Sequence, residues 1–200
     1  MMQIDEERAA LIDALAQNAG FDGWTTTSVR MALSSLGRDP AEAELAFPGG
    51  RSEMITSYFA LRDERMIEAQ PAQAPGFGLT ARVRAAVAAR LALMDGEKEA
   101  VRRALAWLIL PSQAPHLAKI IAHMADSVWF AAGDKSADMS WYSKRAILGA
   151  ILCATLLYWL NDGSTDSEKT MIFLDRRLAG VVRFGKLKAR LPRFPRFQGA

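Results

Sequence analysis

The sequence predicts an all-α protein, and three features of the 200-residue chain support this fold class. Apolar residues recur at helical spacing in most segments, and glycines and prolines separate these segments. No segment shows sustained alternation of apolar and polar residues, which is the pattern of a half-buried strand. Half of the residues are hydrophobic and 24% are charged, as in an ordinary globular protein. This composition excludes a disordered chain, a collagen-like chain and a protein with many membrane spans.

The first seventy residues are predicted to form four helices. Gly20–Gly23, Gly37 and Pro48–Gly50 end the first three, because glycine and proline terminate helices. The segment Gln70–Gly78 contains two prolines and two glycines, and we interpret it as a hinge. The four predicted helices cover Asp5–Asn18, Thr25–Leu36, Pro40–Phe47 and Ser52–Ala69.

Four or five longer helices are predicted beyond this hinge. Turns at Asp95-Gly96, Pro111–Pro115, Gly133–Ser136 and Asn161–Asp166 separate them. The predicted helices cover Leu79–Met94, Glu97–Leu110, residues 115–132, residues 140–160 and Ser167–Arg190. We therefore divide the chain into a helix-turn-helix-like region of residues 1–69, a helical domain of residues 79–180 and a tail of residues 181–200.

Charge is distributed unevenly along the chain, although the formal net charge is only +3. Residues 1–70 hold 12 acidic and 6 basic side chains, whereas residues 176–200 hold 8 basic side chains and no acidic one. A basic segment of this kind is typical of tails that contact an anionic partner. The chain opens with Met-Met-Gln-Ile-Asp-Glu-Glu, which lacks the basic and apolar regions of a targeting peptide, so we expect a cytoplasmic compartment.

The order of the N-terminal helices resembles that of TetR-type transcriptional regulators. Their linking helix begins with a tyrosine-phenylalanine signature, which Tyr58-Phe59 matches here. A helix that binds DNA specifically needs basic and polar side chains to approach the phosphates and read the bases. The corresponding segment, Asp39–Phe47, carries three acidic residues and no basic residue. We therefore expect no specific binding to nucleic acid, and a TetR-type transcriptional regulator remains the alternative function.

Candidate catalytic and metal-binding residues are few. His116 and His123 are seven residues apart and Asp126 follows one turn later, but no further ligands accompany them. The single cysteine, Cys153, lies among apolar residues, which excludes a disulfide framework and a thiolate metal site. No Ser/His/Asp order, phosphate-binding loop or dinucleotide-binding motif is present. We expect a protein that is not an enzyme and that uses no metal and no cofactor.

The predicted helix that ends at Leu160 is apolar on every side, so other elements must surround it. Its apolar run of fifteen residues is shorter than the ~20 residues that a membrane span needs. A bundle core, a dimer interface and a cavity for a long apolar ligand remain open as explanations. The candidate lipid-binding residues are Trp129, Phe130, Ile147, Ile151, Leu152, Thr155, Leu156, Tyr158, Trp159 and Phe173.

The last predicted helix becomes purely basic from Arg176-Arg177 onward. Apolar residues recur there every three or four positions between Lys and Arg. An apolar stripe with a cationic border is typical of a helix that lies in a membrane interface or in a partner groove. A solvated chain end is the alternative. The predicted membrane-binding residues are Val181, Phe184, Lys186, Leu187, Lys188, Arg190 and Leu191.

Five sequence blocks within Glu97–Gly180, about 40% of the chain, resemble the Coq-nine family, the lipid-binding accessory proteins of ubiquinone biosynthesis. The block from Gly133 to Ala146 is highly specific, and the match through the helix-turn-helix region is weaker. The five blocks are Leu-Ala-Trp-Leu-Ile-Leu-Pro at 105–111, Ala-Asp-Ser-Val-Trp at 125–129, Ala-Gly-Asp-Lys-Ser-Ala-Asp-Met-Ser-Trp-Tyr-Ser-Lys-Arg-Ala at 132–146, Ala-Thr-Leu-Leu-Tyr-Trp-Leu at 154–160 and Phe-Leu-Asp-Arg-Arg at 173–177.

This resemblance implies a TetR-like all-α bundle with a degenerate helix-turn-helix and an amphipathic C-terminal helix on the membrane. It implies a homodimer with a pocket for an isoprenoid lipid or quinone intermediate. Members of the family present that ligand to the demethoxyubiquinone hydroxylase, and the docking patch corresponds to Trp141, Tyr142 and Arg145. Other quinone-synthesis enzymes are further candidate partners. The lack of a mitochondrial transit peptide suggests a bacterial member at the cytoplasmic side of the inner membrane, or an already processed chain at the matrix side in a eukaryote.

Overall fold

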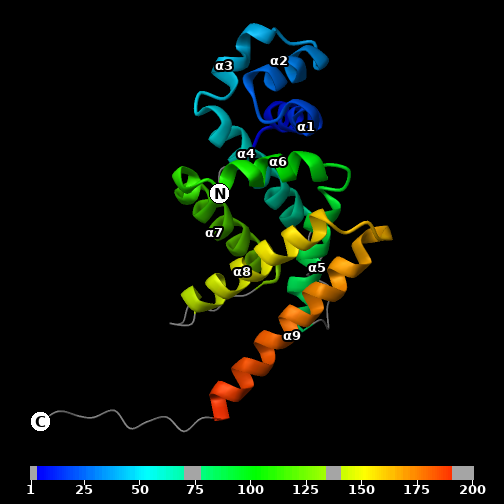
Figure 1. The fold of residues 1–200 in the computed structure, drawn as a ribbon, viewed down its shortest axis with the longest axis vertical. Helices are drawn as coiled ribbons and strands as arrows, with labels where there is room; N and C mark the ends of the chain where they lie inside the picture. Colours follow the sequence, from blue (N-terminus) through cyan, green and yellow to red (C-terminus); the bar gives the residue numbers. More distant parts are fainter. Residues whose placement is uncertain (1–3, 70–77, 134–140, 191–200) are drawn as a thin grey trace, which may run out of the picture.

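A computed structural model of the chain describes residues 4–69, 78–133 and 141–190, and the side chains of these residues except 141–142 and 182–190. Across these ranges every regular element is helical and no β-strand occurs, which confirms the all-α prediction (Figure 1). The α-helices are α1 (Glu6–Asp22), α2 (Thr26–Ser35), α3 (Ala43–Ala46), α4 (Gly50–Glu68), α5 (Leu79–Ala92), α6 (Lys98–Leu108), α7 (Ala114–Ala131), α8 (Trp141–Leu160) and α9 (Glu168–Arg190). Short 3₁₀ turns at Pro40–Glu42, Pro111–Gln113 and Thr165–Ser167 precede α3, α7 and α9.

Local chemistry sets the two ends of α1. The Asp5 carboxylate accepts a hydrogen bond from the backbone N–H of Arg8 at 2.7 Å and caps the helix. The helix continues through Gly20 and ends at Asp22, before Gly23 with φ +75°. The predicted end at Asn18 was therefore wrong by four residues, because the left-handed conformation that favours glycine is needed only at Gly23.

The next two helices follow the predicted pattern. Thr25 caps α2 by accepting a hydrogen bond from the backbone N–H of Ser28, and Gly37 follows the helix with φ +70°. The segment predicted as a third helix holds one 3₁₀ turn and the four residues of α3. It therefore contains only about one turn of α-helix.

A buried arginine on α4 joins the N-terminal helices to the rest of the chain. The Arg62 guanidinium donates to Asp13 on α1 at 2.7 Å and to Glu97, the N-cap residue of α6, at 2.6 Å. The Tyr58 hydroxyl donates to the same Glu97 at 2.7 Å. Burial and the adjacent Glu97 carboxylate raise the pKa of Tyr58 above its ordinary value. Trp24 adds a bond from its indole N–H to the Ala100 carbonyl at 2.9 Å, and one hydrophobic core runs from Leu11 to Leu178.

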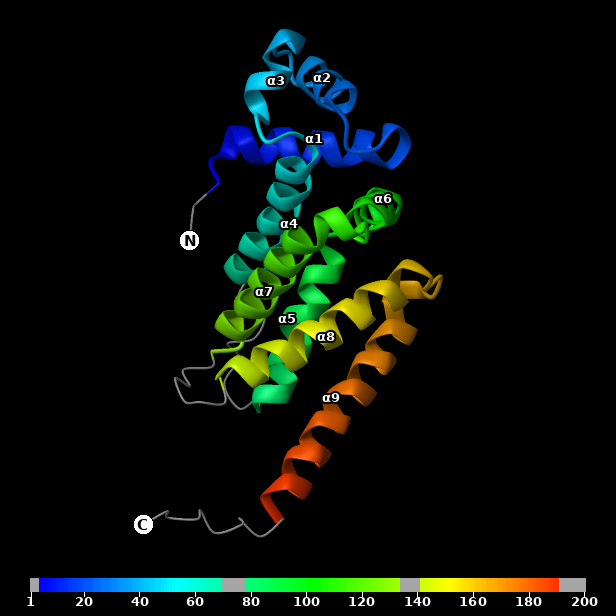
Figure 2. The same cartoon turned by 60° about the vertical axis from the view of Figure 1, so that its left-hand side comes forward.

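The helix α7 lies between α4 on one side and α8 on the other, while α9 runs beside α8 and α5 (Figures 1 and 2). The C-terminal half of α9 projects beyond the other helices. Asp162 stabilises the turn between α8 and α9, because its carboxylate accepts bonds from the backbone N–H groups of Ser164 and Thr170 at 2.9 and 2.8 Å. Burial alone would raise the pKa of Asp162, but these bonds and those from the two hydroxyls hold it well below its usual range.

One side of α8 is exposed in the single chain. Leu148, Leu152 and Trp159 are buried, whereas Leu157 is 57% exposed and Ile147 is 43% exposed. The prediction that other elements surround α8 is therefore met on part of its surface only. Among the described residues, one segment, Ser143–Leu160, is long and apolar enough to cross a membrane, and core helices of soluble proteins share that property.

Candidate lipid-binding site

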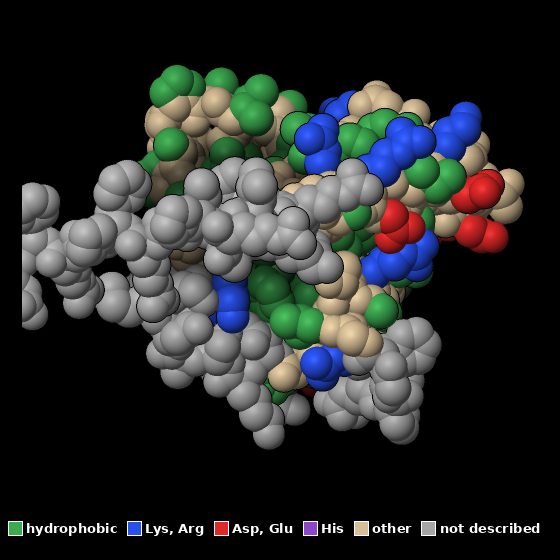
Figure 3. Space-filling model, turned by 90° about the horizontal axis from the view of Figure 1, so that it is seen from below, with side chains coloured by type: hydrophobic (Ala, Val, Ile, Leu, Met, Phe, Trp, Pro, Cys, Tyr) green, Lys and Arg blue, Asp and Glu red, His purple; other side chains and the backbone are tan. Residues whose placement is uncertain are grey.

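An apolar cavity of about 240 Å³ lies between α5, α7, α8 and α9. Eight of its ten lining residues are hydrophobic. In the view from below, hydrophobic side chains gather in a hollow with Lys and Arg side chains near its border (Figure 3). Apolar enclosure with a few polar groups is the usual composition of a small-molecule site. The lining residues are Leu79, Thr80, Val83, Trp129, Lys144, Ile147, Leu148, Ile151, Leu178 and Val181.

Helical spacing explains why these residues meet. Residues three or four positions apart lie on one face of a helix. Leu79 and Val83 form such a pair on α5, Ile147 and Ile151 form one on α8, and Leu178 and Val181 form one on α9. Trp129 on α7 supplies the remaining wall. Four helices therefore direct apolar faces into the same space.

One residue of the cavity wall, Trp129, also carries a hydrogen-bond donor that lacks an acceptor in the described part of the chain. The indole N–H of Trp129 is buried and has no acceptor among the described residues. A buried donor without a partner costs about 1–3 kcal/mol. An acceptor on a bound molecule, such as a carbonyl oxygen, would remove this cost.

The structure places three of the ten candidate lipid-binding residues, Trp129, Ile147 and Ile151, in the cavity wall. Four others are buried in the core outside this wall, and the remaining three lie nearer the surface. Phe130 is 67% exposed, and Tyr158 stacks on Phe173 with ring centroids 4.6 Å apart. The four core residues are Leu152, Thr155, Leu156 and Trp159.

Sequence reasoning missed the contributions of α5 and of the middle of α9 to the cavity. The apolar pairs Leu79–Val83 and Leu178–Val181 are visible in the sequence as helical spacing. That spacing shows that the two residues of each pair share one face of a helix. It does not show which other helix packs against that face. The convergence of four faces depends on the packing angles of the helices.

The docking residues predicted from the family resemblance lie at the start of α8. Trp141 and Tyr142 are its first two residues, and their side chains lie outside the described ones. Arg145 is half-buried and forms an ion pair with Asp126 on α7. One residue of the predicted patch, Arg145, therefore takes part in the contact between α7 and α8.

The first of the predicted membrane-binding residues, Val181, lies at the apolar cavity. Val181 lines the cavity and is 38% exposed. Phe184, Lys186, Leu187, Lys188 and Arg190 belong to α9, but their side chains lie outside the described ones. Leu191 lies outside the described residues, as does most of the predicted hinge, residues 70–77. No cluster of three His, Cys, Asp or Glu residues able to hold a metal ion occurs in the described part of the chain.

Comparison with known proteins supports the family resemblance. The COQ9 family model matches residues 114–185. The ubiquinone biosynthesis protein COQ9, mitochondrial, of Rattus norvegicus is 33% identical over 172 residues, which cover 82% of this chain and 54% of the rat protein. The Homo sapiens protein of the same name is 32% identical with the same coverage, and that of Drosophila melanogaster is 26% identical over 90% of this chain and 56% of its own length. The chain spans about half the length of the curated relatives that it matches.

A solved structure shows the same fold. The TetR transcriptional regulator from Nitrosomonas europaea superimposes with a TM-score of 0.68 and covers 90% of this chain and 99% of its own, at 21% sequence identity. This likeness concerns the fold alone, and it confirms the predicted TetR-like bundle. The matched segment and the curated relatives confirm the predicted resemblance to the COQ9 family, and the relatives named above are ubiquinone biosynthesis proteins.

Proposed function

We propose that this protein is a lipid-binding accessory protein of ubiquinone biosynthesis. It binds an isoprenoid lipid or a quinone intermediate and presents it, without catalysing a reaction itself, to the demethoxyubiquinone hydroxylase at a membrane surface. The observation that carries this proposal is the apolar cavity, one of whose lining residues, Trp129, has a buried indole N–H with no acceptor among the described residues. The names of the relatives supply the pathway.

The size of the cavity suggests which part of the ligand it holds. At about 240 Å³ it is smaller than the ~300–1,000 Å³ of typical ligand pockets. It therefore accepts a quinone ring and the first part of a tail, with Trp129 donating to a ring carbonyl. The rest of the tail leaves past Val181, which also begins the basic amphipathic segment of α9. This arrangement connects the cavity to a membrane on which that segment lies.

A substitution that fills the cavity tests ligand binding. Ile151→Phe adds volume inside the wall, whereas Ile172→Phe adds the same group at an exposed position of α9. We expect the protein with Ile151→Phe to retain little quinone or isoprenoid lipid after purification, measured by mass spectrometry of an organic extract. The protein with Ile172→Phe should retain as much as the unmodified chain. Equal lipid content in both folded variants would place the lipid elsewhere.

A second substitution tests the role of the indole N–H. Trp129→Phe keeps an aromatic ring and removes the donor. Because a neutral hydrogen bond contributes about 0.5–1.5 kcal/mol, we expect a two- to twelvefold weaker affinity for a short-chain ubiquinone. Affinity for a hydrocarbon of similar size should not change. Equal weakening for both ligands would mean that shape, rather than a hydrogen bond, determines binding.

The proposed partners use two other surfaces. Trp141, Tyr142 and Arg145 form the proposed patch for the hydroxylase. Replacing Trp141 and Tyr142 with alanine should weaken capture of the hydroxylase and leave the thermal melt unchanged, whereas loss of folded protein would exclude a docking role. The exposed apolar side of α8, which includes Leu157, supports a homodimer. Leu157→Arg should then give a monomer by light scattering, and an unchanged mass would exclude this interface.

We also propose that the protein does not bind DNA specifically. The segment at the position of a recognition helix is a single turn, and the Glu44 side chain on it is exposed. A carboxylate at this position repels phosphates. Selection from random duplexes at physiological salt should yield no shared sequence, and recovery of a shared motif would favour the regulator instead.

A further inference from the structure

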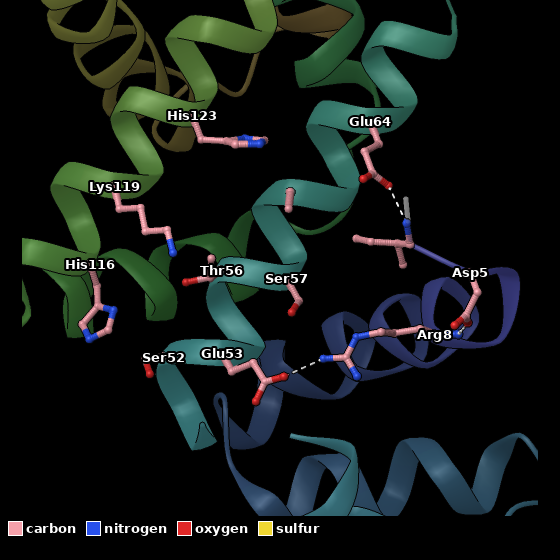
Figure 4. Close-up of a pocket in the computed structure, with 12 residues that line it drawn as sticks. Asp5, Arg8, Ser52, Glu53, Thr56, Ser57, Glu64, His116, Lys119 and His123 are labelled. Carbon is pink, nitrogen blue, oxygen red and sulfur yellow. Dashed lines mark hydrogen bonds and ion pairs between the residues drawn. The ribbon is translucent and has the colours of Figure 1, made fainter. Parts of the chain in front are cut away.

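A second cavity in the described part of the chain is separate from the apolar one. It measures about 590 Å³, lies between α1, α4 and α7, and shares no lining residue with the apolar cavity. Ten of its twelve lining residues are polar or charged, and Figure 4 shows that its two sides differ. Arg8 on α1 extends to Glu53 on α4, and Glu64 reaches the chain just before α1, whereas Lys119 on α7 extends towards α4 from the other side.

The carboxylates on the α1 side already have partners. Glu53 binds the Arg8 guanidinium at 2.8 Å and accepts a bond from the backbone N–H of Gly49 at 2.7 Å. Asp5 caps α1, and Glu64 accepts a bond from the backbone N–H of Ile4 at 3.3 Å. The negative charge of this cavity is therefore partly neutralised by protein groups at its α1 side.

The other side is a groove between α4 and α7, lined by Ser52, Thr56, His116, Lys119 and His123, which we name the α4–α7 groove. The spacing of its residues places three of them on one face of α7 and two on one face of α4. The Lys119 side chain is exposed and that of Thr56 is half-buried, and neither makes a hydrogen bond or ion pair with another described residue. The groove thus presents a charge and a donor that the described chain leaves unused.

His123 is held in a fixed orientation at one end of the groove. Its Nδ1 lies 3.0 Å from the carboxylate of Asp63, which is itself bound to Arg90 at 2.6 Å. Asp63 and Arg90 are almost completely buried. Because Nδ1 is engaged, Nε2 is the ring nitrogen left for a ligand, and it donates when the ring is protonated. A smaller hollow of about 50 Å³ extends the groove towards Asp63 and is also lined by Thr56, Lys119 and His123.

We propose that the α4–α7 groove binds a small oxyanion of the phosphate type. Lys119 supplies the charge, Thr56 supplies a hydroxyl donor, and the His116 and His123 rings supply N–H donors. Phosphate oxygens accept such charge-assisted bonds, and lysine is a usual phosphate ligand. The phosphate belongs either to a free anion or to the headgroup of a lipid, because both present the same oxygens.

The chain offers a direct reporter of this site, since His116 and His123 are its only two histidines and both line the groove. Nuclear magnetic resonance signals of the two imidazole rings therefore report on the groove and not on the basic tail. On addition of inorganic phosphate to the full chain at constant ionic strength and pH, we expect both ring signals to shift and saturate. Shifts that stay linear in phosphate concentration would mean an adventitious ion only, and would overturn the proposal.

Matched variants locate the binding. Lys119→Ala should weaken phosphate binding about tenfold or more, because a bond to a charged group is involved. Lys169→Ala, which removes an exposed lysine on α9, should leave the binding unchanged. Thr56→Val should weaken binding, whereas Ser57→Ala, at a neighbouring hydroxyl directed towards α1, should not. Equal effects within either pair would overturn the proposal, and Lys119→Gln replaces Lys119→Ala if the latter lowers the melting temperature.

A further titration distinguishes the two sources of the anion. Soluble short-chain phosphatidate below its micelle concentration is compared with inorganic phosphate on the same ring signals. Tighter saturation by phosphatidate, lost in Lys119→Ala, identifies a lipid headgroup as the ligand. Equal affinity identifies a free phosphate. Absence of saturation with both probes contradicts the oxyanion site.

Discussion

At the scale of single residues, Asp63 connects three helices. It lies on α4, binds Arg90 on α5 at 2.6 Å and binds His123 on α7 at 3.0 Å. Asp63 and Arg90 are both almost completely buried. A buried ion pair adds little net stability compared with an apolar pair, but removal of one partner leaves the other charge without compensation. Asp63 is therefore needed because Arg90 is present.

Asp63→Asn should lower the free energy of unfolding by about 3–5 kcal/mol, because it leaves the buried Arg90 guanidinium uncompensated. Asp126→Asn is the matched control, since this half-exposed carboxylate pairs with Arg145 near the surface and should change stability by less than about 1 kcal/mol. Chemical denaturation of both variants provides the comparison. If both lose the same small amount, the buried pair does not contribute as the geometry suggests.

His123 should make stability depend on pH. Its hydrogen bond to Asp63 raises the pKa of His123, the charges of Asp63, Asp126 and Glu64 act in the same direction, and burial opposes them. Because the pKa is higher in the folded state, the stabilisation is complete below the unfolded pKa of about 6.5 and is lost as pH rises through the folded value. The stability difference between the unmodified chain and His123→Gln should therefore shrink above about pH 6.5.

The matched control for that pH dependence is His116→Gln, which removes the other histidine. His116 has a ring contact with Trp107 and no carboxylate partner among the described residues. Comparison of the two variants between about pH 6 and 8 separates the contribution of the Asp63 contact from the effect of removing a histidine. A difference for His123→Gln that stays constant across this range would contradict the role of Asp63.

Single-residue features divide into those that the sequence predicts and those that it does not. Thr25 as the cap of α2 and Gly37 as its end follow from local rules, because the interacting groups are close in sequence. Arg62 bonds to Glu97 and Arg90 bonds to Asp63 across 35 and 27 residues. Such pairs depend on the packing of whole helices, so a single sequence contains no signal for them.

At the scale of elements, the helices lie close to their predicted positions. Local periodicity and breakers determine these boundaries, so α5, α7 and α9 match to within a few residues. The exposed side of α8 was not predicted. Composition indicates that a helix is apolar. It does not indicate whether the residues that pack against the helix belong to the same chain or to a partner.

The crossing of α7 and α8 depends on Gly149. A Cβ atom at this position would lie 2.8 Å from Cγ2 of Ile121 on α7, which is closer than real contacts allow. Glycine costs about 0.5–1 kcal/mol relative to alanine in a helix interior. The chain accepts this cost because the absent Cβ lets the two helices approach each other.

Gly149→Ala should therefore destabilise the protein, because overpacking of about 1–3 kcal/mol exceeds the helix propensity that alanine adds. Gly180→Ala is the control, since no atom lies within 4 Å of its added Cβ and the substitution should stabilise α9 by about 0.5–1 kcal/mol. Adding Ile121→Leu to Gly149→Ala removes the β-branched methyl group and should restore part of the loss. Thermal melts with the same sign for both alanine variants would contradict a tight crossing at Gly149.

At the scale of the whole molecule, α7 contributes to both cavities. Its N-terminal half carries His116, Lys119 and His123 into the α4–α7 groove, and its C-terminal half carries Trp129 into the apolar cavity. The apolar cavity lies between the helices that include α9, whose basic end projects from the molecule. If the tail rests on a membrane, the apolar cavity is the one nearer to the lipid, and the acidic N-terminal region points away from an anionic surface.

This orientation predicts reversible attachment to anionic membranes through α9 and the residues after it. Residues 176–200 hold eight basic side chains and no acidic one. Each basic group near an anionic surface contributes about 1 kcal/mol, which salt weakens, whereas insertion of apolar side chains persists in salt. The full chain should float with anionic liposomes and less with neutral ones. A chain that ends at Leu178 should stay at the bottom, and equal flotation of that folded chain would mean that the tail is only a solvated end.

Two full-length variants separate the two contributions. Replacing Arg183, Lys186, Lys188 and Arg190 with glutamine keeps the apolar stripe, so the remaining flotation should be weak and insensitive to salt. Replacing Phe184 and Leu187 with serine keeps the charge, so flotation should occur at low salt and disappear at high salt. The opposite pattern would be salt-sensitive flotation of the glutamine variant and salt-resistant flotation of the serine variant. It would mean that the arrangement of basic and apolar side chains on α9 does not determine attachment.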